Sequence, residues 1–275
     1  MSMTAEGFLG RTALVTGGRG GIGFAFARAL AERGCRVVIT SRDPRSTEVA
    51  ERLAAIAAVT AERVAPPAAI AWDMDEDATK AATAATAALD AAGIHVDVLV
   101  HAAHVFAPHQ LILATKPEGL ARSLERNVVA PFALLRRLTR SMARARFGRV
   151  LLVGSLVAEA GGAGQSIYIT EKAALEGMAR AFAAEMGSRN VLVNVVAPGI
   201  VDTAHVRAAV RPEVIRAFEQ RSVAGRLPTP DEVALAAMGL LDGRQAFVTG
   251  QVLRVAGGAD ALALSPESAP GSGGG

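Results

Sequence analysis

Residues 12–23, TALVTGGRGGIG, are the starting point for the architecture of this chain. The apolar segment over residues 12–16 predicts a short β-strand, and the glycines that follow it predict a tight turn. An alanine-rich helical pattern comes next and ends at Gly34. Glycines in such a turn let backbone N–H groups approach a phosphate, and the helix N-terminus adds its partial positive charge. Because a second apolar strand follows over residues 36–41, the order strand–turn–helix–strand predicts a dinucleotide-binding unit rather than a flexible loop.

The same alternation of strands and helices continues to residue 256. Further strands are predicted over residues 68–73, 96–100, 149–155, 191–197 and 251–256. Helical patterns lie at about residues 44–64, 75–92, 117–146 and 167–188, and from 230 onwards. We therefore predict an α/β fold, with one domain over residues 1–264 built on a Rossmann-like, doubly wound parallel sheet of about seven strands. The glycine- and serine-rich residues 265–275 are predicted to form a flexible tail.

The composition is that of a globular protein and argues against several classes. Among 275 residues, 51% are apolar and 20% are charged, which is enough apolar material for a large core. A net charge of +3 and an aromatic content of 4% argue against nucleic-acid binding. The single cysteine, Cys35, is predicted to be a buried small hydrophobe rather than part of a disulfide framework. With no signal peptide and no apolar run of membrane-spanning length, we expect a cytoplasmic protein without a membrane partner.

The end of the second strand, residues 40–43, bears on the choice between NADPH and NADH. An NAD site places a carboxylate at this strand end, whereas an NADP site removes it and supplies a cation. By count from the glycine turn, the strand-end position is Ser41, so Arg42 is placed to bind a 2′-phosphate by a forked contact. Arg19 in the turn is a second candidate cation. This pattern favours NADPH, although a shift by one or two residues would make Asp43 the ribose-binding acid.

Polar residues also follow the third and fourth predicted strands. Asp73 is placed to bind an adenine amino group, and it can also serve as the N-cap of the next helix. His101 and His104 lie three residues apart, a spacing that suggests a metal. No third ligand lies nearby, so no metal site is predicted.

Tyr168 and Lys172 supply the candidate proton-transfer chemistry. Four residues apart on a helix, they share one face, and an ammonium beside a phenol favours the phenolate. We therefore expect Lys172 to lower the pKa of Tyr168 toward a value useful for proton transfer. Ser155, at the end of the fifth strand, is placed to hydrogen-bond a substrate carbonyl. The Tyr-x-x-x-Lys spacing also arises by chance in many helices, so its weight depends on the rest of the chain.

Two further features lie near the carboxyl edge of the predicted sheet. Asn127 lies inside the long helix, four residues before Pro131, and a proline cannot donate to the carbonyl of Asn127. That carbonyl is then free to hold a water, or the proline is an ordinary kink. Residues 200–226 are predicted to form a mobile lid over the same edge, and Thr229 is the predicted N-cap of the helix that follows.

Together these features resemble the short-chain dehydrogenase/reductase family over residues 8–260. The resemblance is carried, in family order and spacing, by Thr16-Gly17-x-x-x-Gly21-x-Gly23, Asp73, Asn127, Ser155, Tyr168-x-x-x-Lys172, Asn194 and Pro198-Gly199. It implies that Tyr168 is the general acid and that Ser155 orients the substrate carbonyl. It further implies that Lys172 lowers the tyrosine pKa and binds the nicotinamide ribose, and that the carbonyl of Asn127 holds a relay water.

The resemblance also implies a set of cofactor-binding residues and reveals two departures from the family pattern. The set is Gly17, Arg19, Gly21, Ile22, Gly23, Ser41, Arg42, Asp73, Met74, Ala102, Ala103, Tyr168, Lys172, Pro198, Gly199, Ile200 and Thr203. His104 replaces a glycine and puts a side chain near the substrate entrance, and Glu171 replaces a small serine. A carboxylate at 171 would compete for the Lys172 ammonium if it turned inward, but adjacent helical residues point about 100° apart.

Within the family, the closest resemblance is to the 3-oxoacyl-(acyl carrier protein) reductases of fatty acid or polyketide biosynthesis, through residues 194–199, 224–227 and 248–253. It implies NADPH-dependent reduction of a 3-oxoacyl thioester, with Arg146 and Arg189 receiving an acidic carrier protein. It also implies a homotetramer that pairs the helices at 117–146 and 167–188. Both arginines are equally compatible with ordinary solvated helix ends. The alternatives are a small-molecule ketoreductase or alcohol dehydrogenase of secondary metabolism, and a cofactor-binding homologue that has lost turnover.

Overall fold

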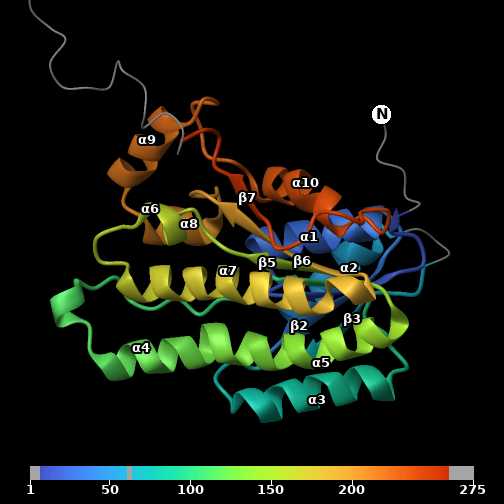
Figure 1. Cartoon of the computed structure of the whole chain (residues 1–275). Coiled ribbons are helices and arrows are strands. Elements are labelled where there is room, and N and C mark those ends of the chain that lie inside the picture. Colours follow the sequence, from blue (N-terminus) through green and yellow to red (C-terminus); the bar gives the residue numbers. More distant parts are fainter. Residues whose placement is uncertain (1–6, 61–63, 260–275) are drawn as a thin grey trace, which may run out of the picture.

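A computed structural model describes residues 7–60 and 64–259, and within them seven parallel strands form one sheet. The strand order is β3-β2-β1-β4-β5-β6-β7. Figure 1 shows α1 and α10 on one side of the strands and α3 and α5 on the other. The strands are β1 (Thr12–Thr16), β2 (Arg36–Ser41), β3 (Ala68–Ala71), β4 (Val98–His101), β5 (Gly148–Val153), β6 (Val191–Pro198) and β7 (Val252–Val255). The predicted doubly wound parallel sheet is confirmed. The predicted tail over residues 265–275 lies outside the described residues.

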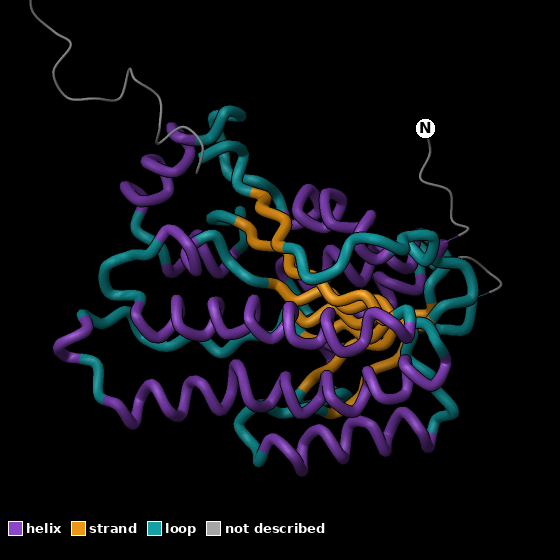
Figure 2. The backbone as a smooth tube through the Cα atoms, in the orientation of Figure 1, coloured by secondary structure: helices purple, strands orange, loops and turns teal. Residues whose placement is uncertain are grey.

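Helices cover both faces of the sheet (Figure 2). The first face carries α1 (Gly21–Glu32), α2 (Thr47–Ala57) and α10 (Pro230–Leu241), and the second carries α3 (Ala78–Ala91), α5 (Ala130–Ala145) and α7 (Ser166–Met186). Successive strand residues point to opposite faces, so Leu14 packs in one core while Ala13 and Val15 pack in the other. The chain therefore forms three layers with a hydrophobic core on each side of the sheet.

Shorter helices connect these layers. They are η2 (Ile112–Ala114), α4 (Pro117–Leu124), η3 (Glu125–Val129), α6 (Val157–Ala160), η4 (Gly187–Arg189), α8 (Ala204–Ala209) and α9 (Pro212–Arg221). The segment predicted as a lid contains α8 and α9. Within the described ranges, no helix is both long enough and apolar enough to cross a membrane.

The predicted long helix over residues 117–146 contains a π-helical turn. It consists of α4, the π-helix η3 and α5 in succession, and Asn127 lies in the π-turn. Pro131 follows two residues after the turn and has no N–H to donate. Single π-turns inside helices are frequent at functional sites. A change in helical hydrogen bonding therefore occurs at the position where the sequence predicts an open carbonyl.

Two strands end two residues earlier than predicted, and one predicted cap is wrong. Strands β3 and β5 stop at Ala71 and Val153, so Asp73 and Ser155 lie in the loops that follow. Helix α3 is capped by Asp77, whose carboxylate accepts from the Lys80 N–H at 2.8 Å. The carboxylate of Asp73 instead accepts from the N–H of Asp75 at 2.9 Å, which folds the loop back on itself.

Two local predictions are confirmed. Thr229 caps α10 in a reciprocal arrangement, because its hydroxyl accepts from the Glu232 N–H at 3.2 Å while the Glu232 carboxylate accepts from the Thr229 N–H at 2.8 Å. Cys35 is fully buried, and burial raises the pKa of its thiol to about 12. A thiol with such a pKa is inert at neutral pH.

The position of β1 selects one edge of the sheet for ligand binding. Strand β1 pairs with β2 on one side and with β4 on the other. The chain leaves β1 toward α1 on one face and leaves β4 toward α4 and α5 on the other. In open parallel sheets, ligands bind in the crevice that such a reversal opens at the carboxyl ends of the strands.

Candidate active site

The glycine turn after β1 lies directly against the end of β4. Gly17 has φ +69, and a Cβ there would lie 2.7 Å from the backbone nitrogen of Ala103. A Cβ at Gly23 would lie 2.3 Å from the carbonyl oxygen of Gly17, so α1 packs closely on the turn. Only glycine fits at these two positions. A Cβ at Gly21 would lie 3.6 Å from Thr203, so the loop after β6 also reaches the turn.

The hydroxyl of Thr16 joins the ends of β1 and β4. Its Oγ1 accepts from the N–H groups of Ala102 and Ala103, both at 3.2 Å, and lies 2.8 Å from Nδ1 of His101. Burial lowers the pKa of His101 to about 3, so this imidazole is neutral. His101 therefore has a structural partner of its own, and the described residues hold no group of three or more potential metal ligands.

The candidate NADPH-selecting residues surround the end of β2. Ser41 is buried, and its hydroxyl donates to the carbonyl of Asp43 at 3.0 Å. Arg42 is exposed, whereas the carboxylate of Asp43 accepts from the N–H of Arg45 at 3.0 Å. Arg19 forms a half-exposed ion pair with Glu48 at 2.9 Å. Exposed pairs of this kind contribute at most about 1 kcal/mol, so Arg19 is easily released toward a phosphate.

The predicted catalytic residues converge at the carboxyl end of β5. Tyr168 and Lys172 lie in the first turns of α7, and the Lys172 ammonium donates to the carbonyl of Val153 at 2.9 Å. That ammonium is 5.6 Å from the centre of the Tyr168 ring. Ser155 is buried, and its hydroxyl lies close enough to the Tyr168 phenol to lower the pKa of that phenol. The structure therefore brings Ser155, Tyr168 and Lys172 together.

The pKa of Tyr168 is shifted upward, so the predicted downward shift by Lys172 is wrong for this arrangement. Burial is the largest cause and raises the pKa, the hydrogen bond with Ser155 lowers it, and the charge of Glu171 raises it further. The Lys172 ammonium is held by Val153 rather than by the phenol oxygen. Burial lowers the pKa of Lys172 to about 8, while the charge of Glu171 raises it. At neutral pH the phenol is therefore protonated, which is the form that a general acid requires.

Asn127 is fixed by its side chain. Its amide donates to the carbonyl of Val105 at 2.9 Å and accepts from the N–H of the same residue at 2.9 Å. These two hydrogen bonds to the backbone of Val105 hold the π-turn against the loop after β4. The relay water on the Asn127 carbonyl stays a prediction.

Glu171 does not contact the Lys172 ammonium but is fully buried between α7, α4 and the loop after β4. Its carboxylate accepts from the Asn127 amide at 2.9 Å, lies 3.0 Å from Nε2 of His104, and accepts a short hydrogen bond from Ser123. We call these four residues the Glu171 cluster. Sequence reasoning singled out Glu171 and His104 as unusual but missed their pairing and the role of Ser123. The sequence did carry a signal for this pairing, because both residues that depart from the family pattern, His104 and Glu171, lie in the same site.

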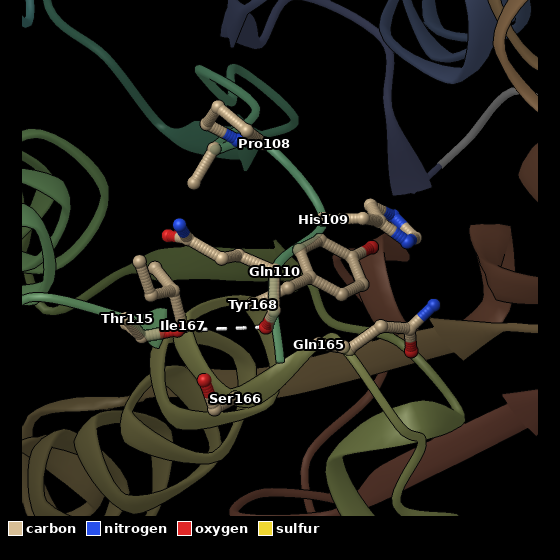
Figure 3. Close-up of a pocket in the computed structure, with 10 residues that line it drawn as sticks. Pro108, His109, Gln110, Thr115, Gln165, Ser166, Ile167 and Tyr168 are labelled. Carbon is tan, nitrogen blue, oxygen red and sulfur yellow. Dashed lines mark hydrogen bonds between the residues drawn. The ribbon is translucent and has the colours of Figure 1, made fainter. Parts of the chain in front are cut away.

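An aromatic stack borders the same region. The Phe106 ring is 4.6 Å from His104, 6.0 Å from Tyr168 and 4.5 Å from His205 in α8. The segment predicted as a lid thus reaches Tyr168 through Phe106, another residue that sequence reasoning missed. Beside it lies a small pocket, lined by residues 107–110, Thr115 and residues 164–168; Tyr168 extends toward His109, whereas the Gln110 side chain points away from the ring (Figure 3).

The two candidate carrier-binding arginines lie near each other, at the end of α7 that is far from this pocket. Arg146 follows α5, and its guanidinium approaches the carbonyl of Ser188 at 3.5 Å. Arg189 lies in η4, directly after α7. Tyr168 is near the opposite end of α7, and 21 helical residues span about 30 Å.

Comparison with known proteins defines the class of this protein. Residues 17–260 match a family model described as enoyl-(acyl carrier protein) reductase. The chain is 36% identical over 250 residues to the 3-oxoacyl-(acyl-carrier-protein) reductase FabG of Vibrio cholerae, covering 90% of this chain and 97% of that protein. The chain belongs to the short-chain dehydrogenase/reductase family, and it is an oxidoreductase of that family.

Two solved structures show the same fold. A 3-oxoacyl-(acyl-carrier-protein) reductase from Agrobacterium tumefaciens C58 with NADP bound has a TM-score of 0.80 and 29% identity, covering 91% of this chain and 95% of that one. A protein from Beutenbergia cavernae, named as an NAD(P)-dependent gluconate 5-dehydrogenase and holding NADP at low occupancy, has a TM-score of 0.82 and 31% identity, covering 92% and 98%. These two proteins share a fold although their names refer to different substrates.

Proposed function

We propose that this protein reduces a ketone with NADPH, and that the substrate is a 3-oxoacyl thioester carried on an acyl carrier protein. The observation that carries the proposal is the convergence of Ser155, Tyr168 and Lys172 at the ligand-binding edge of the sheet, where Ser155 and Lys172 are buried and the Lys172 ammonium is anchored on the carbonyl of Val153. The substrate class is supported by the FabG relative, and the cofactor by the neighbours that hold NADP.

The residues present fit a dinucleotide cofactor. Gly17 lets the turn pack against the Ala102–Ala103 backbone, where a Cβ would not fit, so the turn and the start of α1 lie at the ligand-binding edge, and Arg42 is an exposed cation at the end of β2. The turn, Asp73, Met74, the Ala102–Ala103 peptide and the loop over residues 198–203 would hold the cofactor. When bound, NADPH supplies the hydride.

The protein's own residues deliver the proton and fix the geometry. Ser155 orients the substrate carbonyl and stabilises its developing negative charge. Tyr168, neutral before the reaction, gives its proton to the carbonyl oxygen as the hydride arrives. Lys172, with a pKa near 8, remains largely protonated at neutral pH and stabilises the phenolate that forms. The carbonyl of Asn127 holds the water that returns a proton.

Recruitment of a carrier protein by Arg146 and Arg189 requires a second copy of the chain. Within one chain the two arginines lie at the end of α7 remote from Tyr168. If α7 pairs in antiparallel fashion with a partner's α7, as the proposed homotetramer would allow, the partner's arginines come near this chain's Tyr168. Their positive charge then lies where an acidic carrier would dock.

A small hydroxylated substrate is the second candidate, favoured by the gluconate 5-dehydrogenase neighbour and by polar His109, Gln110 and Gln165 beside Tyr168. The two candidates differ in the substrate that gives the higher kcat/KM. A panel of 3-oxoacyl thioesters and small polyol-derived ketones, assayed with NADPH and with NADH, separates them.

Tyr168→Phe tests the proton donor directly. We expect kcat for ketone reduction to fall by about 10²–10⁴-fold, since general acid catalysis contributes that much. NADPH should still bind, as a fluorescence titration would show, because the ring is retained. A variant with wild-type turnover would remove Tyr168 from the mechanism.

A further inference from the structure

The Glu171 carboxylate is a meeting point of three structural elements. Ser123 comes from α4, Asn127 from the π-turn and His104 from the loop after β4, and all three bond to a side chain of α7. Four hydrogen-bonding side chains with this much burial form a connected polar network rather than a surface ion pair.

The bonding pattern fixes the chemical form of the pair. Burial tends to raise the pKa of Glu171, but the hydrogen bonds from His104, Ser123 and Asn127 outweigh it and leave the pKa lowered. The carboxylate is therefore ionised and can only accept, so Nε2 of His104 must carry a hydrogen. Nδ1 of His104 is buried without a partner in the described structure, and burial lowers the pKa of this histidine. The imidazole is neutral, and the pair keeps one buried negative charge.

This charge lies next to the residues proposed to transfer the proton. Glu171 directly precedes Lys172 in α7, and the His104 ring packs edge-on against Tyr168 with 5.2 Å between ring centres. The same carboxylate holds the Asn127 amide. Glu171 therefore bonds Asn127 directly, reaches Tyr168 through His104, and adjoins Lys172 along the helix.

We propose that Glu171 and His104 form a positioning pair for the active site: the buried carboxylate ties Asn127 to the helix that carries Tyr168 and Lys172, and the His104 ring fixes the face of Tyr168. This inference rests on the proposed function, because it assigns the pair to the proton-transfer step. The pair also sets the local charge. Glu171 raises the pKa of both Tyr168 and Lys172, and the other titratable groups nearby are His101, His104 and His205.

The charge is tested by Glu171→Gln, which keeps the side-chain shape and removes the negative charge. Tyr168 is the only tyrosine in the chain, so tyrosinate ultraviolet absorbance during a pH titration reports on it alone. We expect the titration midpoint to fall by about one pH unit, since a nearby like charge is removed. The alkaline limb of the kcat–pH profile should move in the same direction. Glu185→Gln, an exposed control on the same helix, should leave the midpoint in place.

The pairing is tested by a double-mutant cycle. His104→Ala and Glu171→Ala should each lower kcat by about tenfold with little change in KM for NADPH, and the double variant should fall no further. His104→Gly with Glu171→Ser, the residues usual in the family, gives a foldable reference if the alanine variants prove unstable. Additive losses, or a tyrosinate midpoint unmoved in Glu171→Gln, would overturn the proposal. Because the titration needs no turnover, it remains decisive even if the wild type reduces no ketone and the proposed function fails.

Discussion

At the end of β1 the site is formed by backbone atoms, whereas beside Tyr168 it is formed by the four side chains of the Glu171 cluster. The glycine turn works because Gly17 and Gly23 lack a side chain, so β1, β4 and α1 approach within a few ångströms. The cluster works because the carboxylate of Glu171 is buried and bonded to three neighbouring side chains. The glycine turn depends on the absence of side chains at Gly17 and Gly23, whereas the Glu171 cluster depends on side chains that pair chemically with one another.

This difference determines how each region responds to change. A backbone-formed turn fails by steric overlap at one position, independently of the residues around it. A buried carboxylate fails through its partners, since losing one donor leaves charge or a polar atom unsatisfied. The turn therefore tolerates changes in its surroundings, while the cluster depends on all four of its side chains.

The largest effect is expected from Gly17→Ala, which breaks the backbone-formed region. The new Cβ would lie 2.7 Å from the Ala103 nitrogen at φ +69. The variant should unfold at lower denaturant concentration and bind NADPH more than about 100-fold more weakly, a loss of more than about 2.8 kcal/mol. Both are measured by urea titration and by fluorescence binding.

Gly93→Ala is the matched control for that variant. Gly93 has φ +62, but a Cβ there meets nothing within 4 Å. It should cost only the left-handed backbone strain of about 1–2 kcal/mol, with NADPH affinity unchanged. Equal losses of stability in the two variants would show that the cost of Gly17→Ala comes from backbone strain rather than from contact with Ala103.

The same contrast explains what the sequence could predict. The parallel sheet, the glycine turn and the positions of Ser155, Tyr168 and Lys172 follow from periodicity and motif order, because they depend on local backbone geometry. The direction of the Tyr168 pKa shift could not be predicted from the sequence, because it depends on burial and on where the Lys172 ammonium points. The Glu171 cluster joins residues up to 67 positions apart, and spacing along the chain carries no information about such contacts.

Arg42→Ala tests the cofactor preference and should have an intermediate effect. Loss of a charge-assisted contact to a 2′-phosphate should raise KM for NADPH by about 10–100-fold, or roughly 1.5–3 kcal/mol, while KM for NADH stays nearly constant. Steady-state kinetics with both cofactors measures this. Asp43→Ala is the partner variant: if it alone weakened NADH and left NADPH untouched, the ribose-binding role would pass to Asp43.

The smallest effect is expected from charge reversal at Arg146 and Arg189, which lie outside both regions. The double glutamate variant should lower kcat/KM several-fold for a carrier-bound 3-oxoacyl substrate, because electrostatic attraction mainly speeds encounter. A free thioester analogue should be reduced at the wild-type rate, since neither arginine contacts the pocket beside Tyr168. Arg140→Glu, exposed on α5, is the control for charge alone. The loss for the carrier-bound substrate should shrink as salt rises; equal losses with both substrates would instead favour a small-molecule ketoreductase.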